Sequence, residues 1–343
     1  MSKIAVNEIT NEAGTGAPSF NNGINATSLN GGQFGGRRNL IINGAMQVAQ
    51  RGTSFTAAGG YSLDRWGWSF SGGNGTVTQE SFALDSEVGG CKNYLKFAVT
   101  TGNNFAGIYQ NIEDVQSIKG GETYTISFYA KGTNPGGGTT KVRMRQYFGS
   151  GGSANVETID SITLTNSWQR FTITKIQNSL SGKTIGTGSY IQLFIHQDEL
   201  DTSTDAWELN ITGVQLEVGD TATPFEHRSY GEELALCQRY YSTNYLSSQT
   251  IGQSSAWDGA SITIITDQNG DTASIFLPVQ MRSSPSVTIY SPQTGVQGTY
   301  HYSGSTNPSA DVLRQTPFNF NLQSSRTFTA ERVLVMFEAD AEL

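Results

Sequence analysis

Tyr124-Thr-Ile-Ser-Phe-Tyr-Ala-Lys131 is the stretch of sequence that decides the fold. Apolar residues alternate along it with polar or mixed ones, which is the period of two of a strand with one buried face. Residues 141–148 repeat this alternation, whereas residues 190–195 are apolar on both faces except at Gln192. The first two segments are therefore predicted to be half-buried strands, and the third to be a central strand.

Similar patterns flank this stretch on both sides. Clusters of Gly, Asn and Ser separate the apolar segments, as expected of strands that are joined by tight turns. The repetition predicts an all-β protein whose larger part is an antiparallel β-sandwich. The other strands expected in this part are residues 39–44, 61–70, 76–79, 94–100, 107–112, 161–165, 168–175, 207–212 and 214–218.

Three aromatic residues recur at even spacing early in the predicted sandwich: Trp66, Trp68 and Phe70. On a strand these residues would share one face. That face either packs into the core or forms a platform on which sugar rings stack. The sequence leaves both interpretations open.

Composition agrees with an all-β protein and narrows the class of partner. Of the 343 residues, 40 are Gly, only 8 are Pro, and 15% are charged. The net charge of −8 includes no block of like charge, which argues against nucleic acid as the main partner. The chain opens without the pattern of a signal peptide, and no apolar run approaches the ~18 residues of a membrane span. We therefore expect a protein that is made in a cytoplasm and is not inserted into a membrane.

Three parts are expected along the chain. Residues 1–36 are too poor in apolar side chains to form a core, so they form either a disordered tail or an extended arm that docks on a partner, and we expect the arm. Residues 37–228 contain the sandwich. Ser229-Tyr-Gly-Glu232 has the S-x-x-E pattern of a capping box, which predicts a helix over residues 230–241. Residues 229–343 are then this helix and a second, smaller β-sandwich.

The predicted helix carries an apolar stripe of Leu234, Cys237 and Tyr241, with Tyr240 beside it. The stripe either packs on the chain's own domains or is covered by other copies of the chain, and we expect a homotrimer. Cys237 and Cys91 lie in different predicted domains, so we expect two buried thiols instead of a disulfide.

Asn269-Gly270 lies between the apolar segments 260–266 and 273–277 and predicts a tight β-hairpin. The surrounding Asp267-Gln-Asn-Gly-Asp271 also has a faint likeness to a calcium loop. However, its Gly stands at the fourth position instead of the sixth, and Pro278 stands at the twelfth, so we expect no bound metal. The remaining strands expected in the second domain are residues 286–290, 319–322 and 333–338.

Sequence motifs of catalysis are absent. Neither a phosphate-binding loop nor a G-x-S-x-G pattern occurs. The acidic cluster Asp198-Glu199-Leu-Asp201 is typical of a solvated loop, and the histidines lack the spacing of zinc ligands. We therefore expect a protein that is not an enzyme and that uses no cofactor.

Several segments resemble phage tail-fibre and virion-appendage proteins, particularly those of phages of marine bacteria. Arg38-Asn-Leu-Ile-Ile-Asn-Gly-Ala-Met-Gln-Val-Ala-Gln-Arg-Gly52 and Tyr61-Ser-Leu-Asp-Arg-Trp66 resemble the opening of those proteins. Residues 213–241 resemble them more closely still. Ser2-Lys-Ile-Ala-Val-Asn-Glu-Ile9 is similar to their virion-attachment segment.

The sandwich itself resembles a carbohydrate-binding jelly roll at residues 124–132 and 168–173. Together the resemblances imply a structural virion appendage, either a tail fibre or a capsid-attached fibre. They also imply attachment to other virion proteins through the N-terminal arm and contact with host surface glycans. The alternatives are a glycan depolymerase on the same virion and a cellular carbohydrate-binding protein.

A ligand site is expected on residues 141–148 and on residues 124–131, which are predicted to be neighbouring strands. Rings stack on the apolar faces of sugars, and guanidinium groups suit carboxylates or phosphates, so an acidic surface glycan is the expected ligand. The alternative is a face that is solvated or buried against another subunit. The outward side chains would be Lys131, Lys141 and the four residues predicted to bind the ligand: Tyr129, Arg143, Arg145 and Tyr147.

Overall fold

The structure is a computed structural model, and it is nearly all β, with 48% strand and 3% helix, as the sequence predicts. Of the predicted N-terminal arm, it describes little more than the paired strands β1 (Ser28–Leu29) and β2 (Gly32–Gln33). Docking of the arm therefore lies outside the described residues. The residues described are 28–29, 32–33, 38–56, 59–71, 74–101, 105–134, 138–197, 206–265, 272–302, 307–324 and 331–343.

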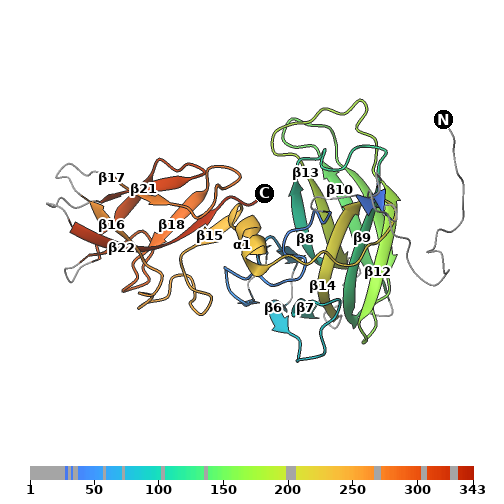
Figure 1. The fold of residues 1–343 in the computed structure, drawn as a ribbon, viewed down its shortest axis with the longest axis horizontal. Helices are drawn as coiled ribbons and strands as arrows, with labels where there is room; N and C mark the ends of the chain where they lie inside the picture. The colour runs from blue at the N-terminus through green and yellow to red at the C-terminus, as the bar shows by residue number, and fades with distance from the viewer. Residues whose placement is uncertain are drawn as a thin grey trace, which may run out of the picture.

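Two six-stranded antiparallel sheets form the larger part of the fold and pack face to face (Figure 1). We call them sheet I and sheet II. Sheet I consists, in order, of β12 (Gln169–Ile176), β9 (Thr123–Thr133), β14 (Trp207–Val218), β7 (Asn93–Thr101), β6 (Asn74–Ser81) and β3 (Ser54–Phe55). Sheet II consists of β11 (Val156–Ile162), β10 (Thr140–Tyr147), β13 (Tyr190–Gln197), β8 (Phe105–Glu113), β5 (Gly67–Ser71) and β4 (Gly60–Tyr61).

Alternating side chains from both sheets form the core between them. Trp66 and Trp68 are 0% and 1% exposed within this core, and Phe70 packs against it. Core packing is therefore the right interpretation of the evenly spaced aromatic residues, and the sugar platform is wrong. The apolar character of residues 190–195 is likewise explained, because β13 is a central strand between β10 and β8.

Residues 39–44 do not form a strand, contrary to the prediction. Instead they dock on a β-bulge in β14, the strand that unites the predicted segments 207–212 and 214–218. The register shifts between Thr212 and Gln215, which frees Val214 N–H to bond the carbonyl of Gly44 at 2.9 Å. A Cβ atom at Gly44 would lie 2.2 Å from the carbonyl oxygen of Val214. The two backbones can therefore come this close only because residue 44 is glycine.

The predicted capping box begins α1 (Tyr230–Gln238), and both of its hydrogen bonds are present. Cys237 and Tyr241 are buried within the chain, as is Tyr240. The helix is shorter than the predicted 230–241, because it ends at Gln238 and Tyr241 begins the strand β15 (Tyr241–Thr243). Leu234 is half-buried, and the trimer stays a prediction. Cys91 and Cys237 are both buried free thiols, as expected.

The strands after α1 form two smaller sheets around their own apolar clusters. The long strand β22 (Glu331–Asp340) is the centre of the larger sheet. Its partners are β15 (Tyr241–Thr243), β16 (Ser261–Ile265), β18 (Ser286–Tyr290) and β19 (His301–Tyr302). The smaller sheet is β17 (Thr272–Phe276), β21 (Asn319–Ser324) and β20 (Ala310–Leu313).

The hairpin predicted around Asn269-Gly270 is wrong, because its two strands belong to different sheets. β16 pairs with β22, and β17 pairs with β21. The Asn-Gly signal concerns only the residues of the turn. The pairing of each strand is decided by its cross-strand contacts, and here the partners come from distant parts of the chain. The turn itself, and the likeness to a calcium loop within it, lie outside the described residues.

A buried polar network joins the opening of the sandwich to the helix, and we call it the joint. The Asn39 amide donates to the carbonyl of Val214 at 3.0 Å and accepts from Leu216 N–H at 3.1 Å. The backbone N–H of Asn43 donates to the Glu233 carboxylate of α1 at 2.6 Å. The segments that meet here lie within residues 38–52 and 213–241, two of the stretches whose sequences resemble virion appendages.

Arg228 holds the joint together as a buried cation. Its guanidinium donates to the carbonyls of Asn39 and Ile41 and pairs with Glu233 at 3.2 Å. The side chains of Arg228 and Glu233 are only 6% and 4% exposed. Glu226 lies 3.9 Å from the same guanidinium, so the buried cation is balanced by two carboxylates and by backbone carbonyls.

A second set of ion pairs connects the sandwich to the end of β22. Glu342 pairs with Arg65 and, at 3.4 Å, with Arg51. The two guanidinium groups also lie over the rings of Tyr240 and Tyr241, at 3.4 and 3.6 Å from the centroids. Figure 1 shows α1 and the last residues of the chain at this contact between the two groups of strands.

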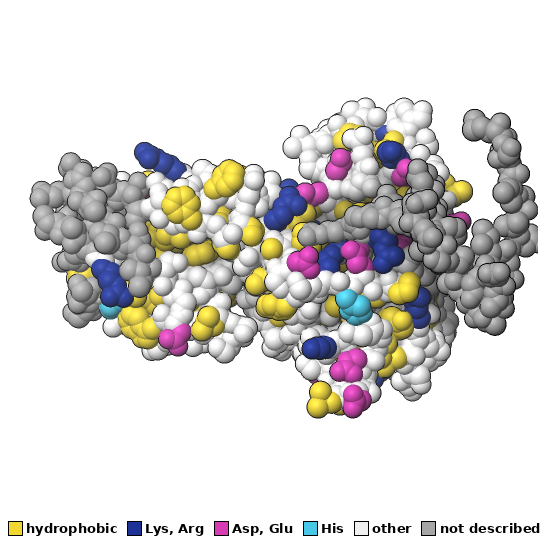
Figure 2. All heavy atoms as spheres, in the orientation of Figure 1, with side chains coloured by type: hydrophobic (Ala, Val, Ile, Leu, Met, Phe, Trp, Pro, Cys, Tyr) yellow, Lys and Arg dark blue, Asp and Glu magenta, His cyan; other side chains and the backbone are white. Residues whose placement is uncertain are grey.

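The surface carries both signs of charge. Figure 2 shows basic and acidic side chains interspersed over the sandwich on the face in view. This mixing agrees with the sequence, in which no block of like charge occurs.

Candidate functional site

The structure separates the four residues predicted to bind a ligand. Arg143, Arg145 and Tyr147 project from β10 on the outer face of sheet II, with alternate residues of that strand buried in the core. Tyr129 projects from β9, which belongs to sheet I. The expectation that β9 and β10 are neighbours is wrong, because the chain crosses from sheet I to sheet II between these two strands.

Tyr129 packs against glycine backbone instead of joining the arginines. A side chain at Gly89 would lie 2.4 Å from its ring, and one at Gly213 would lie 3.0 Å away. The guanidinium of Arg170 is 6.0 Å from the ring centroid. Lys131 lies two residues after Tyr129 on β9, and its Nζ is 5.4 Å from the ring centroid of Trp168. A ligand role for Tyr129 stays a prediction, separate from the site on sheet II.

The two arginines of β10 share one carboxylate on the edge strand β11. Arg145 is directly opposite Glu157 in the register of these strands and forms an ion pair with it. Arg143 also pairs with Glu157, at 3.6 Å. The Glu157 carboxylate therefore contacts both guanidinium groups and fixes them on the sheet surface.

Two tyrosines continue this cluster across to β13. Tyr147 is directly opposite Tyr190, and their ring centroids are 4.6 Å apart with an angle of 31° between the planes. Both residues are half-buried. Burial and the neighbouring Tyr147 raise the pKa of Tyr190, so its hydroxyl remains protonated at neutral pH. The pair thus presents aromatic faces and hydroxyl groups next to Arg145.

An aromatic band crosses the middle of the same face. The guanidinium of Arg143 lies 4.7 Å from the ring centroid of Phe194, and Phe194 meets Tyr109 at 5.9 Å. Glycines make room for these rings: a side chain at Gly107 would lie 2.6 Å from the Phe194 ring, and one at Gly67 only 2.2 Å from the Tyr109 ring. The rings therefore lie down on the sheet in place of projecting from it.

The last residues of the chain cover one side of this face. The carbonyl of Leu343 accepts hydrogen bonds from the Tyr61 hydroxyl at 2.9 Å and from the Asn111 amide at 3.0 Å. On the other side, the side chains of Arg145 and Glu157 are 27% and 29% exposed. The accessible part of the face therefore lies over β11, β10 and the start of β13. We call it the open face, and its residues are Arg143, Arg145, Tyr147, Glu157 and Tyr190.

Sequence reasoning found three of these five residues and missed two. Tyr190 was within a predicted strand, but the apolar character of that strand on both faces drew attention to the core. Glu157 fell outside the predicted strand 161–165, because β11 begins at Val156. The sequence did contain a signal. If the predicted strand 161–165 is extended back to Val156, every second residue from Ser161 through Ile159 to Glu157 lies on the same face as the arginines.

The described residues contain no group of three or more His, Cys, Asp or Glu side chains that could hold a metal ion. In the same part of the chain, no helix has the length and apolar character required to cross a membrane.

Neither a protein-family model nor a curated protein matches this chain. Solved structures that resemble it include the enzymatically active domain of tailspike protein 4 from bacteriophage CBA120, at 15% identity and a TM-score of 0.35. That match covers 52% of this chain and 21% of the tailspike chain, so this chain corresponds to about a fifth of the tailspike length.

Two carbohydrate-binding modules are similar to the same extent. The CBM22-1 xylan-binding domain from Paenibacillus barcinonensis Xyn10C has 13% identity and a TM-score of 0.33, over 57% of this chain and all of that domain. TmCBM61, solved with β-1,4-galactotriose, has 13% identity and a TM-score of 0.30, over 53% of this chain and 99% of the module. At such identities, function has to be argued from the residues of the site itself.

Proposed function

We propose that this protein is a structural appendage of a bacteriophage particle, a tail fibre or capsid-attached fibre, and that its open face binds acidic glycans of the host surface. One observation carries the binding proposal: two tyrosines whose ring centroids are 4.6 Å apart lie beside two arginines that both pair with Glu157. Sugar rings stack on aromatic faces, and the carboxylate of an acidic sugar is a natural further partner for guanidinium groups.

The attachment proposal rests on different residues. The segments that resemble virion appendages form the joint, so the resemblance concerns the way the sandwich is connected to the helix. Residues 1–36 would dock on other virion proteins, and three copies would present three open faces. Weak binding at each face then gives strong adsorption through avidity.

Binding is tested with Tyr147→Ala and Tyr190→Ala in one variant, compared with Tyr94→Ala as the control. Tyr94 is a half-buried ring on β7 of sheet I, away from the open face. We expect the double variant to lose binding to an immobilised acidic polysaccharide and adsorption to host cells, while the control keeps both. Equal adsorption by the double variant and the parent would exclude the open face as the receptor site.

Attachment and activity are tested separately. Deletion of residues 1–36 should leave a folded protein that no longer joins particles, and normal incorporation would contradict docking by the arm. A light-scattering mass of 37.0 kDa would contradict the trimer. Sustained release of reducing ends from host polysaccharide would favour the alternative of a depolymerase.

A further inference from the structure

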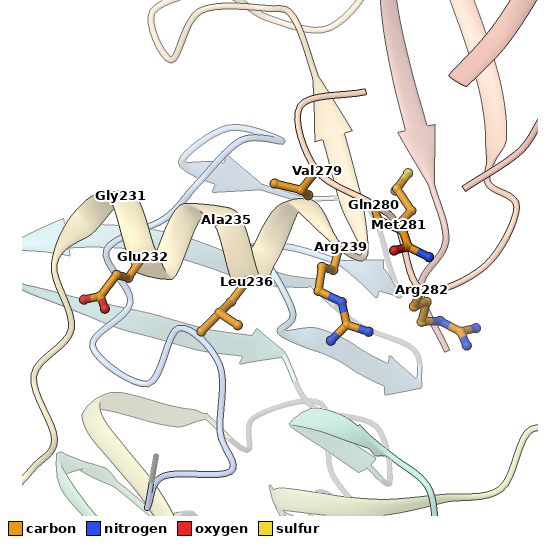
Figure 3. Close-up of a pocket in the computed structure, with 9 residues that line it drawn as sticks. All are labelled: Gly231, Glu232, Ala235, Leu236, Arg239, Val279, Gln280, Met281 and Arg282. Carbon is orange, nitrogen blue, oxygen red and sulfur yellow. The ribbon is translucent and has the colours of Figure 1, made fainter. Parts of the chain in front are cut away.

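A groove of about 750 Å³ lies between α1 and residues 279–282 of the loop that follows β17. Figure 3 shows the helix along one side of it and the loop along the other. The groove is formed where the helix meets the C-terminal group of strands. It lies next to the open face, because Glu113 of β8, which pairs with two of its arginines, is directly opposite Tyr190 in the register of β8 and β13. The lining side chains that concern us are Glu232, Ala235, Leu236, Arg239, Val279 and Arg282.

Two cations stand together at one end of the groove. Arg239 lies at the C-cap of α1, and Arg282 donates its backbone N–H to the carbonyl of Arg239 at 2.8 Å. The side chain of Arg282 is held in place by the carbonyls of Ala341 and Glu342. Figure 3 shows the two guanidinium groups, one from the helix and one from the loop, at the same end of the groove.

A single carboxylate faces these cations from sheet II. Glu113 lies 3.6 Å from Arg239 and 3.9 Å from Arg282, so both ion pairs are longer than a hydrogen bond. The side chains of Arg239 and Arg282 are 43% and 22% exposed. This end therefore has a net positive charge and N–H donors within reach of solvent, which outweigh the weak negative potential of the helix C-terminus.

The rest of the groove differs in character. Leu236, Ala235 and Val279 give it an apolar wall. At the far end, the acidic Glu232 lies on the first turn of α1, about 10 Å from Arg239 at the helical rise of 1.5 Å per residue. The groove is thus basic at one end, apolar along its side and acidic at the other end.

We propose that this groove binds a small molecule with one carboxylate and an apolar ring face, which is the chemistry of a uronic acid. The carboxylate lies between Arg239 and Arg282, and the ring lies on Leu236 and Val279. A second carboxylate would meet Glu232, so the groove selects a single acidic sugar over a polyanion. A site of this kind adds a binding position at the boundary between the two groups of strands, where ligand pockets commonly lie.

The experiment is isothermal titration of the full chain with D-galacturonate, with D-galactose as the neutral counterpart. We expect galacturonate to bind and galactose not to bind. Arg239→Gln, at an exposed position, should weaken the binding of galacturonate about tenfold, as the loss of a charged hydrogen bond predicts. Ala235→Trp should abolish it by filling the groove while leaving both arginines in place.

Arg145→Ala on the open face is the matched control, and it should bind galacturonate in the groove like the parent. If Arg145→Ala loses galacturonate while Arg239→Gln keeps it, the sugar binds on the open face and the groove proposal is overturned. Unchanged binding in both groove variants, or equal binding of galactose, overturns it as well. The adsorption assay on the tyrosine variant tests the proposed function independently of all these results.

Discussion

Glu233 in the joint and Glu157 on the open face have the same side chain but opposite surroundings. Glu233 is 4% exposed and accepts from both Arg228 and the backbone of Asn43. Glu157 is 29% exposed and lies between two arginines at the edge of a sheet. The first carboxylate is a structural requirement, whereas water and ligands compete for the partners of the second.

The contrast extends to the two regions as wholes. The joint is built from two segments, within residues 38–52 and 213–241, and the residues that each contributes are close together in sequence. The open face is assembled from β10, β11 and β13, and its residues become neighbours only through strand pairing. Segments that are continuous in sequence therefore identify the joint. They do not identify the open face, which we propose as the ligand site.

The largest loss of stability is expected from a substitution in the joint. Glu233→Ala removes the closer of the two carboxylates that pair with the buried Arg228, leaving Glu226 at 3.9 Å, and it leaves Asn43 N–H without its acceptor. We expect the free energy of unfolding to fall by about 3–5 kcal/mol. Urea denaturation followed by circular dichroism measures this change.

Glu157→Ala is the matched control for that experiment, because it also removes a carboxylate that bridges arginines. Its exposed ion pairs are expected to contribute less than about 1 kcal/mol. If both variants lost similar stability, the distinction between a structural and a functional carboxylate would be wrong.

The next largest loss of stability is expected at Gly67, the glycine on which the Tyr109 ring rests. In Gly67→Ala, the new methyl group would lie 2.2 Å from the Tyr109 ring, so the ring has to move. We expect a loss of about 1–3 kcal/mol, typical of overpacking. Gly231→Ala serves as the control, since no atom lies within 4 Å of its added methyl group. A Gly67 variant as stable as the Gly231 variant would show that the ring does not rest on this glycine.

The buried thiols give a smaller effect that depends on pH. Burial raises the pKa of Cys91, and raises that of Cys237 well above its ordinary value. Above about pH 8.5 the unfolded chain releases thiol protons that the folded chain retains. Stability should therefore fall with rising pH, by up to about 1.4 kcal/mol per thiol and pH unit.

Comparison with a variant carrying Cys91→Ala and Cys237→Ala isolates this effect from the titration of other groups. The variant should show a shallower decline in unfolding free energy between pH 8 and pH 9.5. In the parent, Ellman's reagent should react at pH 8 only after unfolding. Rapid reaction of the folded parent would contradict the burial of both thiols.

Local patterns predicted the elements well, and the physical reason is that each pattern depends on near neighbours. Alternation located β9, β10 and β13 to within a few residues, and the capping box located the start of α1. The second group of strands was also anticipated, with β18 recovered at residues 286–290.

Pairing was not predictable in the same way, because it depends on contacts between distant residues. β9 and β10 follow one another in sequence yet lie in opposite sheets, which moved Tyr129 away from Arg143 and Arg145. Asn269-Gly270 suggested a hairpin, but β22 and β21 are the partners of its flanking strands. The sequence therefore predicted only the residues of the candidate site that lie on β10, namely Arg143, Arg145 and Tyr147. Glu157 and Tyr190 were found from the register of β10 with β11 and β13.

The smallest expected change in stability accompanies an increase in binding. Glu157→Gln keeps the size of the side chain but removes the charge that Arg143 and Arg145 share. We expect the unfolding free energy to change by less than about 1 kcal/mol, because all three side chains are in contact with solvent. If Glu157 competes with the ligand for the guanidinium groups, the variant should bind an acidic polysaccharide several-fold more tightly than the parent does. Its affinity should also fall more steeply with salt, since the open face would carry one more positive charge. Weaker binding by Glu157→Gln would instead show that this carboxylate positions the arginines for the ligand, and the competition would be disproved.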